Sequence, residues 1–593
     1  MIQSNWGAFI ASLFFILQVH ASDTFDSQWL KLLRYNNYNS SFESEADSNA
    51  FFLTSRGKTD PEGEYQKFIR VMKTPVSGDN HPVCMFPARA LKIFQDNKST
   101  KPDFSKCDKL NRYLKATDPK GASLVFASYF IQKPSSAFGH TFLRLHTNRL
   151  GNAALLDFAV DFAASVDTQN PIAYGVKGII GGFKGRFSRM PYFLKIREYA
   201  DLDSRDVWEY PLNLTNQELL MLTLHLWEMD QAYFDYYYFS ENCSYHILRA
   251  IEAVTNKDIS KDLKFFVLPI DTIHALSKNN VLLSPKRIPS QYSKVKTSLD
   301  SLSQENKLTV LEFYHDPFSF NLNIVNDIFL VDAMIDILNY KFAESLLTDS
   351  SDAKTIKLRE SLLLKRSQMG SSKQPIISTI DSPSSGHFGS YFDMGYSYGD
   401  KKSINLTHAF ALHQFKHSPK GFSNKFQMTM GEIQLSLLKN TIKFDSFKIF
   451  DVMNASTSFF LEFKPSWRFA IGVSRDFSTT NSVEPFALLN SGVSLLADDD
   501  YLLNLSFTFR PRFQEASNQF QLPAGVSLIS QRNGQSFQIG IEASIYRNFD
   551  LSVYEFKLEP YFRKLINRNL EVYIQSSSRR AETQFSSGFT AFY

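Results

Sequence analysis

The final third of the chain alternates apolar and polar residues with a period of two. In residues 503–510, Leu and Phe occupy the odd positions, and Asn, Ser, Thr and Arg occupy the even ones. The pattern returns at 537–545, 554–559 and 570–575. Such alternation predicts β-strands with one apolar and one polar face. From residue 387 onward we count about twelve such segments, each close to the roughly ten residues of a tilted membrane strand.

These strands predict a closed antiparallel β-barrel over residues 387–593, with lipid outside and a polar lumen inside. Closure is required because every backbone N–H and C=O must be paired in lipid. A soluble β-sandwich shows the same alternation and is the alternative. Two observations favour the membrane. Aromatic residues make up 15% of the chain, including 55 Phe, which interface girdles would absorb. The ending Phe585-x-x-x-Phe589-x-Ala591-x-Tyr593 resembles the assembly signal of bacterial outer-membrane barrels, so we expect the barrel assembly machinery as a partner.

The preceding residues have a different periodicity. Helical spacing predicts a small helical domain over 22–120. Residues 121–260 combine short β-rich runs with two apolar helices, the first opened by a capping box at Thr215 and the second beginning near Cys243, which predicts an α+β domain. Residues 261–386 predict helical connections and a Ser/Pro-rich linker. Residues 174–188 are rich in glycine but lack the Lys-Ser/Thr ending of a phosphate-binding loop, so we expect a mobile flap there.

The N-terminus indicates export. Residues 8–19 are apolar, and Val19-His20-Ala21 places small residues at the usual cleavage spacing, so we expect a signal peptide over 1–21. A buried N-terminal helix is the alternative. Export implies an oxidising compartment. We therefore pair Cys84 with Cys107 as a disulfide, which leaves Cys243 as a free thiol.

Composition narrows the functional classes. The net charge is only +4, so we expect no nucleic-acid partner. Apolar residues make up 43% of the chain, which excludes wholesale disorder. No run of about 18 apolar residues follows the signal segment, which argues against a helical membrane protein.

The free thiol is the centre of the candidate chemistry. A helix start favours the thiolate of Cys243, because its free N–H groups and dipole attract negative charge. His140, at the entrance of a predicted strand, is the candidate base. Asp161 or Asp157 on the next strand would orient the imidazole. Asn242 or the Cys243 backbone N–H would be the oxyanion donor.

Structural roles are the alternatives for all of these residues. An unpaired Cys is most often a small buried apolar residue. His246 shares a helix face with Cys243, and we expect it to be structural. No CxxC or HExxH spacing supports a Cys/His zinc site. We expect no cofactor and no metal.

Several blocks resemble the exported domain of the Lnb family: Ser123-Leu124-Val125-Phe126, Phe138-Gly139-His140-Thr141-Phe142-Leu143-Arg144, the 178–185 loop, Trp208-Glu209-Tyr210 and Glu241-Asn242-Cys243-Ser244-Tyr245. Residues 84–89 resemble the small helical domain that often precedes it. The namesake members resemble lipoprotein N-acyltransferases, and the order of His before Cys resembles permuted papain-like (NlpC/LRAT-like) domains. The resemblance implies that fold for 121–260, with Cys243 as nucleophile and His140 as base. This chain departs from the namesakes in carrying a barrel in place of helical membrane segments.

Together these features predict an outer-membrane thiol enzyme with a periplasmic catalytic domain. Its reaction would be acyl transfer or hydrolysis, and its partners outer-membrane lipid and lipoproteins or phospholipid acyl chains. The aromatic cluster 233–239 would line an acyl groove or form ordinary core. A papain-like peptidase or amidase acting on cell-wall peptides is one alternative. A non-enzymatic outer-membrane pore with a periplasmic domain is the other.

Overall fold

The computed structural model describes residues 26–38, 41–97, 101–129, 137–147, 151–347, 352–371, 380–399, 402–423, 425–456, 461–475, 482–495, 500–514, 519–548, 553–579 and 582–593. The predicted signal peptide lies outside these residues. Among the helices that they contain, none is long and apolar enough to cross a membrane.

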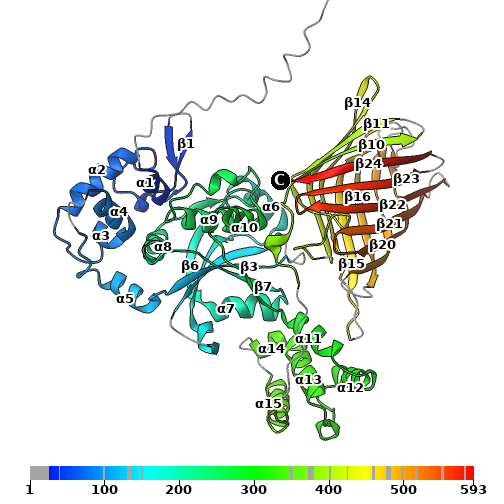
Figure 1. Cartoon of the computed structure of the whole chain (residues 1–593), viewed down its shortest axis with the longest axis horizontal. Helices are drawn as coiled ribbons and strands as arrows, with labels where there is room; N and C mark the ends of the chain where they lie inside the picture. Colours follow the sequence, from blue (N-terminus) through cyan, green and yellow to red (C-terminus); the bar gives the residue numbers. More distant parts are fainter. Residues whose placement is uncertain are drawn as a thin grey trace, which may run out of the picture.

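A group of short helices begins the chain, at the left of Figure 1. It consists of α1 (Ser27–Leu32), the hairpin β1 (Tyr35–Tyr38) and β2 (Ser41–Ser44), α2 (Pro61–Met72), α3 (Pro82–Met85), α4 (Pro87–Asn97) and α5 (Asp108–Thr117). The Cys84–Cys107 disulfide links α3 to the start of α5, which confirms the predicted pairing. Cys243 is a free, buried thiol, as predicted.

An antiparallel sheet forms the centre of the molecule. Its strands run in the order β8 (Phe234–Tyr236), β6 (Phe183–Pro191), β5 (Phe158–Ser165), β4 (His140–His146), β3 (Gly121–Ala127), β7 (Val207–Pro211) and β9 (Lys286–Ile288). The helices around it are α6 (Pro171–Ile180), α7 (Tyr192–Ile196), α8 (Asn216–Met229), α9 (Cys243–Glu252) and α10 (Pro269–Lys278). Side chains of β3 alternate between two apolar clusters, one containing α8 and α9 and the other containing α7, so both faces of the sheet are covered.

The glycine-rich segment is a helix and a strand, not the flap that we expected. Its first half forms most of α6, and its second half forms most of β6. The glycines are required at close approaches. A Cβ at Gly181, where φ is +80°, would lie 2.4 Å from the Tyr237 ring, and one at Gly185 would lie 2.3 Å from the Phe162 ring.

A helical segment with its own apolar core follows the sheet, at the bottom of Figure 1. It comprises α11 (Gln291–Asp300), α12 (Gln304–His315), α13 (Ile328–Lys341), α14 (Ala343–Leu347) and α15 (Ala353–Ser367).

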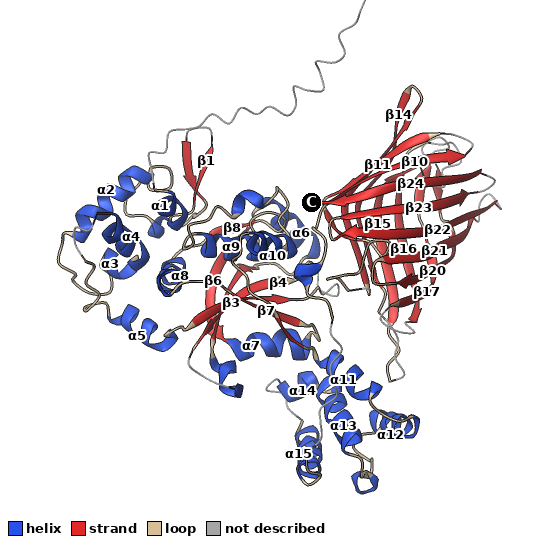
Figure 2. Ribbon diagram, viewed as in Figure 1, coloured by secondary structure: helices blue, strands red, loops and turns tan. Residues whose placement is uncertain are grey.

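The C-terminal region is a closed antiparallel barrel of twelve strands, as predicted (Figure 2). Around the ring lie β10 (Tyr391–Gly399), β11 (Ser403–Ala409), β13 (Phe426–Leu438), β14 (Thr441–Asn454), β15 (Pro465–Ser474), β16 (Glu484–Leu495), β17 (Tyr501–Phe509), β20 (Ala524–Asn533), β21 (Phe537–Asn548), β22 (Val553–Asn567), β23 (Leu570–Arg579) and β24 (Glu582–Phe592). The ring closes where β10 pairs with β24. In addition to these twelve strands, β12 (Ala411–His413) pairs with β13, and the hairpin of β18 (Arg512–Gln514) and β19 (Gln519–Gln521) pairs with β16.

The barrel wall separates apolar and polar residues as the alternation predicted. On β17, Leu505 and Phe507 are each 59% exposed, whereas Ser506 is 2% exposed and Thr508 is fully buried. The interior contains ion pairs, for example Arg468 with Asp451 at 2.6 Å. An apolar exterior around a charged interior is typical of a barrel in lipid.

The barrel is packed against the central domain. The C-terminus lies at the end of the barrel that faces the sheet (Figure 1). At this junction the Tyr129 ring contacts the rings of Phe422 and Phe426, with centroids 5.6 and 4.9 Å apart. Both phenylalanines belong to the same apolar cluster as the α8 and α9 side chains. Helices and sheet followed by a barrel confirm the predicted α+β class, while the permuted papain-like topology stays a prediction.

Candidate active site

Cys243 is the first residue of α9 and is 6% exposed. Asn242 caps the helix, because its side-chain oxygen accepts hydrogen bonds from the backbone N–H groups of Ser244 and Tyr245. The same side chain donates from its amide nitrogen to the carbonyls of Tyr238 and Val267, at 3.1 and 2.7 Å. These bonds fix the start of α9 and place the sulfur at the positive end of the helix dipole.

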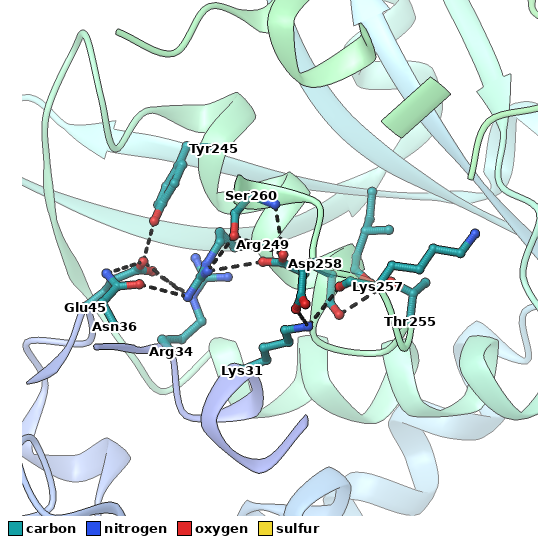
Figure 3. A network of polar contacts seen from close by, with 12 residues as sticks. Lys31, Arg34, Asn36, Glu45, Tyr245, Arg249, Thr255, Lys257, Asp258 and Ser260 are labelled. Atoms are coloured by element: carbon teal, nitrogen blue, oxygen red, sulfur yellow. Dashed lines mark hydrogen bonds and ion pairs between the residues drawn. The ribbon is translucent and has the colours of Figure 1, made fainter. Parts of the chain in front are cut away.

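A polar network holds α9 against the N-terminal helices (Figure 3). Glu45 accepts a hydrogen bond from the Tyr245 hydroxyl at 2.5 Å and pairs with Arg34 at 3.2 Å and with Arg249 at 3.5 Å. Arg34 also contacts the His246 ring at 2.6 Å. His246 therefore lies in this structural network, consistent with the role we expected.

His140 and Asp161 lie on the same face of the sheet. Leu143 of β4 is paired with Val160 of β5, so the alternation of side chains puts His140 and Asp161 together on the opposite face. Nε2 of His140 is 2.7 Å from Oδ1 of Asp161. Because Asp161 occupies Nε2, the ring offers Nδ1 to the sulfur, and a side-chain hydrogen bond joins His140 to Cys243.

The thiol and the imidazole are arranged as an ion pair. Burial lowers the pKa of His140, but the charges of Cys243, Tyr199 and Asp161 raise it further, so that it lies well above its ordinary value. Burial raises the pKa of Cys243, but the His140 charge, the His140 hydrogen bond and a bond from the Thr141 backbone outweigh this, so that its pKa is lowered. Both pKa shifts therefore favour the charged forms of the pair, a thiolate beside an imidazolium.

Asp161 is held charged from its other side. Its Oδ2 lies 2.7 Å from Nζ of Lys195 on α7. Burial raises the pKa of Asp161, but His140 and Lys195 lower it by a larger amount. The Tyr199 ring packs beside His140, with centroids 5.7 Å apart. The sequence reasoning missed Lys195 and Tyr199, because no motif connects their segment with β4 or β5.

Asp157, our alternative to Asp161, does not reach the imidazole. The two aspartates face the same side of the sheet, but four residues of strand separate them by about 13 Å. Asp157 accepts hydrogen bonds from Arg144 at 2.8 Å and from the Thr147 hydroxyl at 2.6 Å. Arg144 in turn pairs with Glu209 at 2.7 Å. Asp157 therefore braces β4 some distance from the thiol.

Asn242, our other alternative, has no amide hydrogen left for an oxyanion. Its amide nitrogen donates hydrogen bonds to two carbonyls, and its amide oxygen accepts the two capping hydrogen bonds described above. The first backbone N–H groups of a helix have no partner within the helix. The N–H of Cys243 is therefore the remaining one of our two candidate donors.

An apolar cavity adjoins the segment that leads into Cys243. Its volume is about 510 Å³, and it is lined by Ile179, Tyr237, Phe239, Ser240, Glu241, Phe265 and Phe266. Phe265 is 80% exposed, and Ile179 and Ile180 of α6 are exposed beside it. Burial raises the pKa of Glu241 to about 7. The wall of this cavity includes part of the aromatic cluster that we proposed as an acyl groove.

Comparison with protein families identifies the central domain. Residues 109–279 match the model described as the Lnb N-terminal periplasmic domain. Residues 24–95 and 381–592 match two further models, each described as a domain of unknown function (DUF7843 and DUF7840). No curated protein matches the chain.

Solved structures similar to part of the chain include two porins and an outer-membrane protein. The KdgM porin has 13% sequence identity, covers 34% of this chain and 99% of its own, and gives a TM-score of 0.23. The NanC porin has 11% identity, the same two coverages and a TM-score of 0.24. An outer-membrane-expressed OmpT of Vibrio cholerae has 6% identity, covers 34% of this chain and 96% of its own, and gives 0.19.

The strand pairing within this chain shows that it forms a barrel. The family match indicates that the domain before the barrel is periplasmic. Residues 109–279 are an Lnb N-terminal periplasmic domain, carried on a twelve-strand outer-membrane-type β-barrel.

Proposed function

We propose that this protein is a periplasmic-facing thiol enzyme that transfers or hydrolyses acyl groups of lipids or lipoproteins. The observation that carries the proposal is the contact between the Cys243 thiol, His140 and Asp161, three groups drawn from α9, β4 and β5. Nucleophile, base and orienting carboxylate in this order are the parts of thiol-based acyl transfer.

The reaction proceeds through a thioester. The Cys243 thiolate attacks the carbonyl carbon of an ester or amide, and the carbonyl oxygen becomes an oxyanion beside the N–H of Cys243. The imidazolium of His140 protonates the leaving group as the carbon–heteroatom bond breaks, which leaves the acyl chain on sulfur. His140, now neutral, removes a proton from an amine or from water, which attacks the thioester and releases the thiolate. Asp161 positions the imidazole throughout.

The surroundings of the thiol support an acyl substrate. The apolar cavity adjoins Ser240 and Glu241, the residues just before the start of α9. Two of its lining side chains, Ile179 and Phe265, are exposed and offer an apolar surface for a chain leaving the bilayer. The barrel keeps the domain at the membrane, so an acyl chain has a short path to the thiol.

The test is the mass of the adduct on Cys243. Full-length protein in proteoliposomes is incubated with phospholipid, and separately with cell-wall peptide fragments, and its intact mass is measured. We expect an acyl-sized increase with lipid that hydroxylamine removes, and none in Cys243→Ala. A peptide-sized adduct would instead support the alternative function, a peptidase or amidase that acts on cell-wall peptides. An unmodified Cys243 in both arms, with the barrel folded, would contradict an enzymatic role.

A further inference from the structure

Three histidines distant from the thiol meet at the end of the barrel that faces the periplasmic domain. His387 precedes β10, His413 ends β12, and His417 lies in the loop that follows. All three side chains are buried. One ring nitrogen from each lies within 4.8 Å of the others. In the part of the chain that the structure describes, this is the one group of histidine, cysteine and carboxylate side chains that satisfies this spacing.

The spacing is close to that of a tetrahedral metal site. Zn–N bonds of about 2.0–2.1 Å place neighbouring ligand nitrogens about 3.4 Å apart. Nε2 of His387 already lies 3.0 Å from Nδ1 of His413. The ring centroids of His417 are 5.8 and 6.0 Å from those of the other two, near the roughly 5 Å of imidazoles that share one ion. A side-chain shift of about 1 Å completes the triangle.

The surroundings fix the orientation of two of the three rings, those of His387 and His413. Nδ1 of His387 lies 2.6 Å from the carbonyl of Phe388 and donates to it, which leaves the Nε2 lone pair facing His413. Phe592 stacks on His387 at 3.9 Å, and Phe422 stacks on both His387 and His413. Without an ion, the His413 Nδ1–H donates to His387. A metal ion takes the place of that proton.

The ligand set selects the kind of ion. Imidazole suits zinc, copper and nickel, whereas magnesium and calcium require oxygen ligands. Three nitrogens leave a fourth tetrahedral position for water. Zinc fits this set and geometry best.

We propose that His387, His413 and His417 bind one Zn²⁺ ion that fastens the periplasmic domain to the barrel. His387 lies on the segment that enters the barrel from the periplasmic side, and its carbonyl lies 3.2 Å from the His274 ring on α10. His413 and His417 belong to the segment that turns into the barrel lumen. The ion therefore joins these two segments at the junction, independently of the chemistry at Cys243.

Zinc binding to the full-length, tag-free protein in detergent tests the proposal. A Cys243→Ser background removes the thiol as a competing ligand, and elemental analysis after desalting gives the stoichiometry. We expect about one zinc ion per chain, a thermal midpoint that rises with zinc, and the visible absorption of tetrahedral cobalt after substitution. His413→Phe, which keeps an aromatic ring against Phe422, should weaken zinc binding about 100-fold or more.

His408→Gln is the matched control, because His408 is on β11 but outside the cluster and bonds Tyr593 instead. It should retain the zinc. His417→Gln repeats the test if His413→Phe does not give the heat-modifiable mobility of a folded barrel on gels. A folded protein without stoichiometric zinc at micromolar free zinc, or zinc retained in both cluster variants, would overturn the site.

Discussion

At the scale of single residues, the charge on the Cys243 sulfur depends on a chain of contacts that begins at His140. The His140 imidazolium lowers the thiol pKa, Asp161 holds that imidazolium, and Lys195 holds Asp161. Each link is a buried contact between opposite charges, so removing one link changes the protonation of the next.

The thiol of the intact protein should ionise at a lower pH than an ordinary cysteine thiol. Because the pKa of Cys243 is lowered, the rate of iodoacetamide alkylation should rise with pH to a plateau with a midpoint below the roughly 8.5 of a free cysteine. His140→Gln removes the imidazolium, and burial alone then raises the pKa, so this midpoint should move above that of a free cysteine. The measurement is the alkylation rate from pH 4 to 10. An unchanged pH profile in His140→Gln would show that His140 does not lower the pKa of Cys243.

Asp161→Asn should reduce acyl turnover by about 100-fold or more while the fold persists, because the imidazole loses both its orientation and the charge that keeps it protonated. Since the pKa of His140 then falls, the pH at which the imidazolium is lost should move downward in the pH–rate profile. Asp157→Asn is the matched control, since Asp157 contacts Arg144 and not His140. Equal losses in the two variants would mean that the effect of Asp161 is structural.

At the scale of secondary-structure elements, the position of α9 depends on the N-terminal helices. Glu45 is buried between Arg34 and Arg249, and it also accepts a hydrogen bond from Tyr245 on α9 (Figure 3). Burial raises the pKa of Glu45, but the two guanidinium groups lower it by more. The small N-terminal unit thus fixes the helix whose first residue is the candidate nucleophile.

Glu45→Gln should destabilise the protein by about 3–5 kcal/mol, because it removes the carboxylate that pairs with the buried Arg34 guanidinium, whereas Arg249 keeps Glu252. The free energy of unfolding of the periplasmic region, followed by urea denaturation in detergent, measures the effect. Glu43→Gln is the control, since Glu43 is largely exposed and lies 3.8 Å from Lys58. It should change stability by less than about 1 kcal/mol. If Glu45→Gln lowered the free energy of unfolding as little as Glu43→Gln does, the result would contradict the role of this network in holding α9.

Some of these elements follow from sequence, and others depend on packing. Alternation predicted the barrel, and a helix start predicted the place of Cys243, because both signals are local. Alternation along the strand puts Asp161 and Asp157 on the same face, so the sequence could not choose between them. Only the register with β4 shows which one lies beside His140. His413 and His417 have the H-x3-H spacing of many zinc sites, but no sequence signal connects them with His387, which the pairing of β10 with β11 brings alongside. The glycine-rich pattern alone predicts a flap, because the ring contacts that require Gly181 and Gly185 come from residues distant in the sequence.

At the scale of the whole molecule, a segment of the chain lies inside the barrel. Residues 414–418 lie inside the ring and contact strands around it. Gln414 contacts Glu432 on β13, Gln538 on β21 donates to the carbonyls of Phe415 and His417, and the Ser418 N–H donates to Glu571 on β23. Phe415 also belongs to an apolar cluster with side chains of β14, β17 and β20. These contacts favour the hypothesis that the barrel anchors the periplasmic domain, rather than the hypothesis that it is a pore.

The plugged lumen predicts that the intact protein conducts poorly. In planar bilayers we expect no stable porin-like current steps, because residues 414–418 fill the interior. Lys416 lies 3.5 Å from Glu542 and 3.8 Å from Glu559, so Lys416→Glu places three carboxylates together and should loosen the segment. Leak through the variant should then exceed that of the parent, while Lys416→Arg, which keeps the charge, should stay closed. Stable open steps from the parent protein would instead favour the pore hypothesis, since a conducting lumen requires these residues to leave the positions they occupy here.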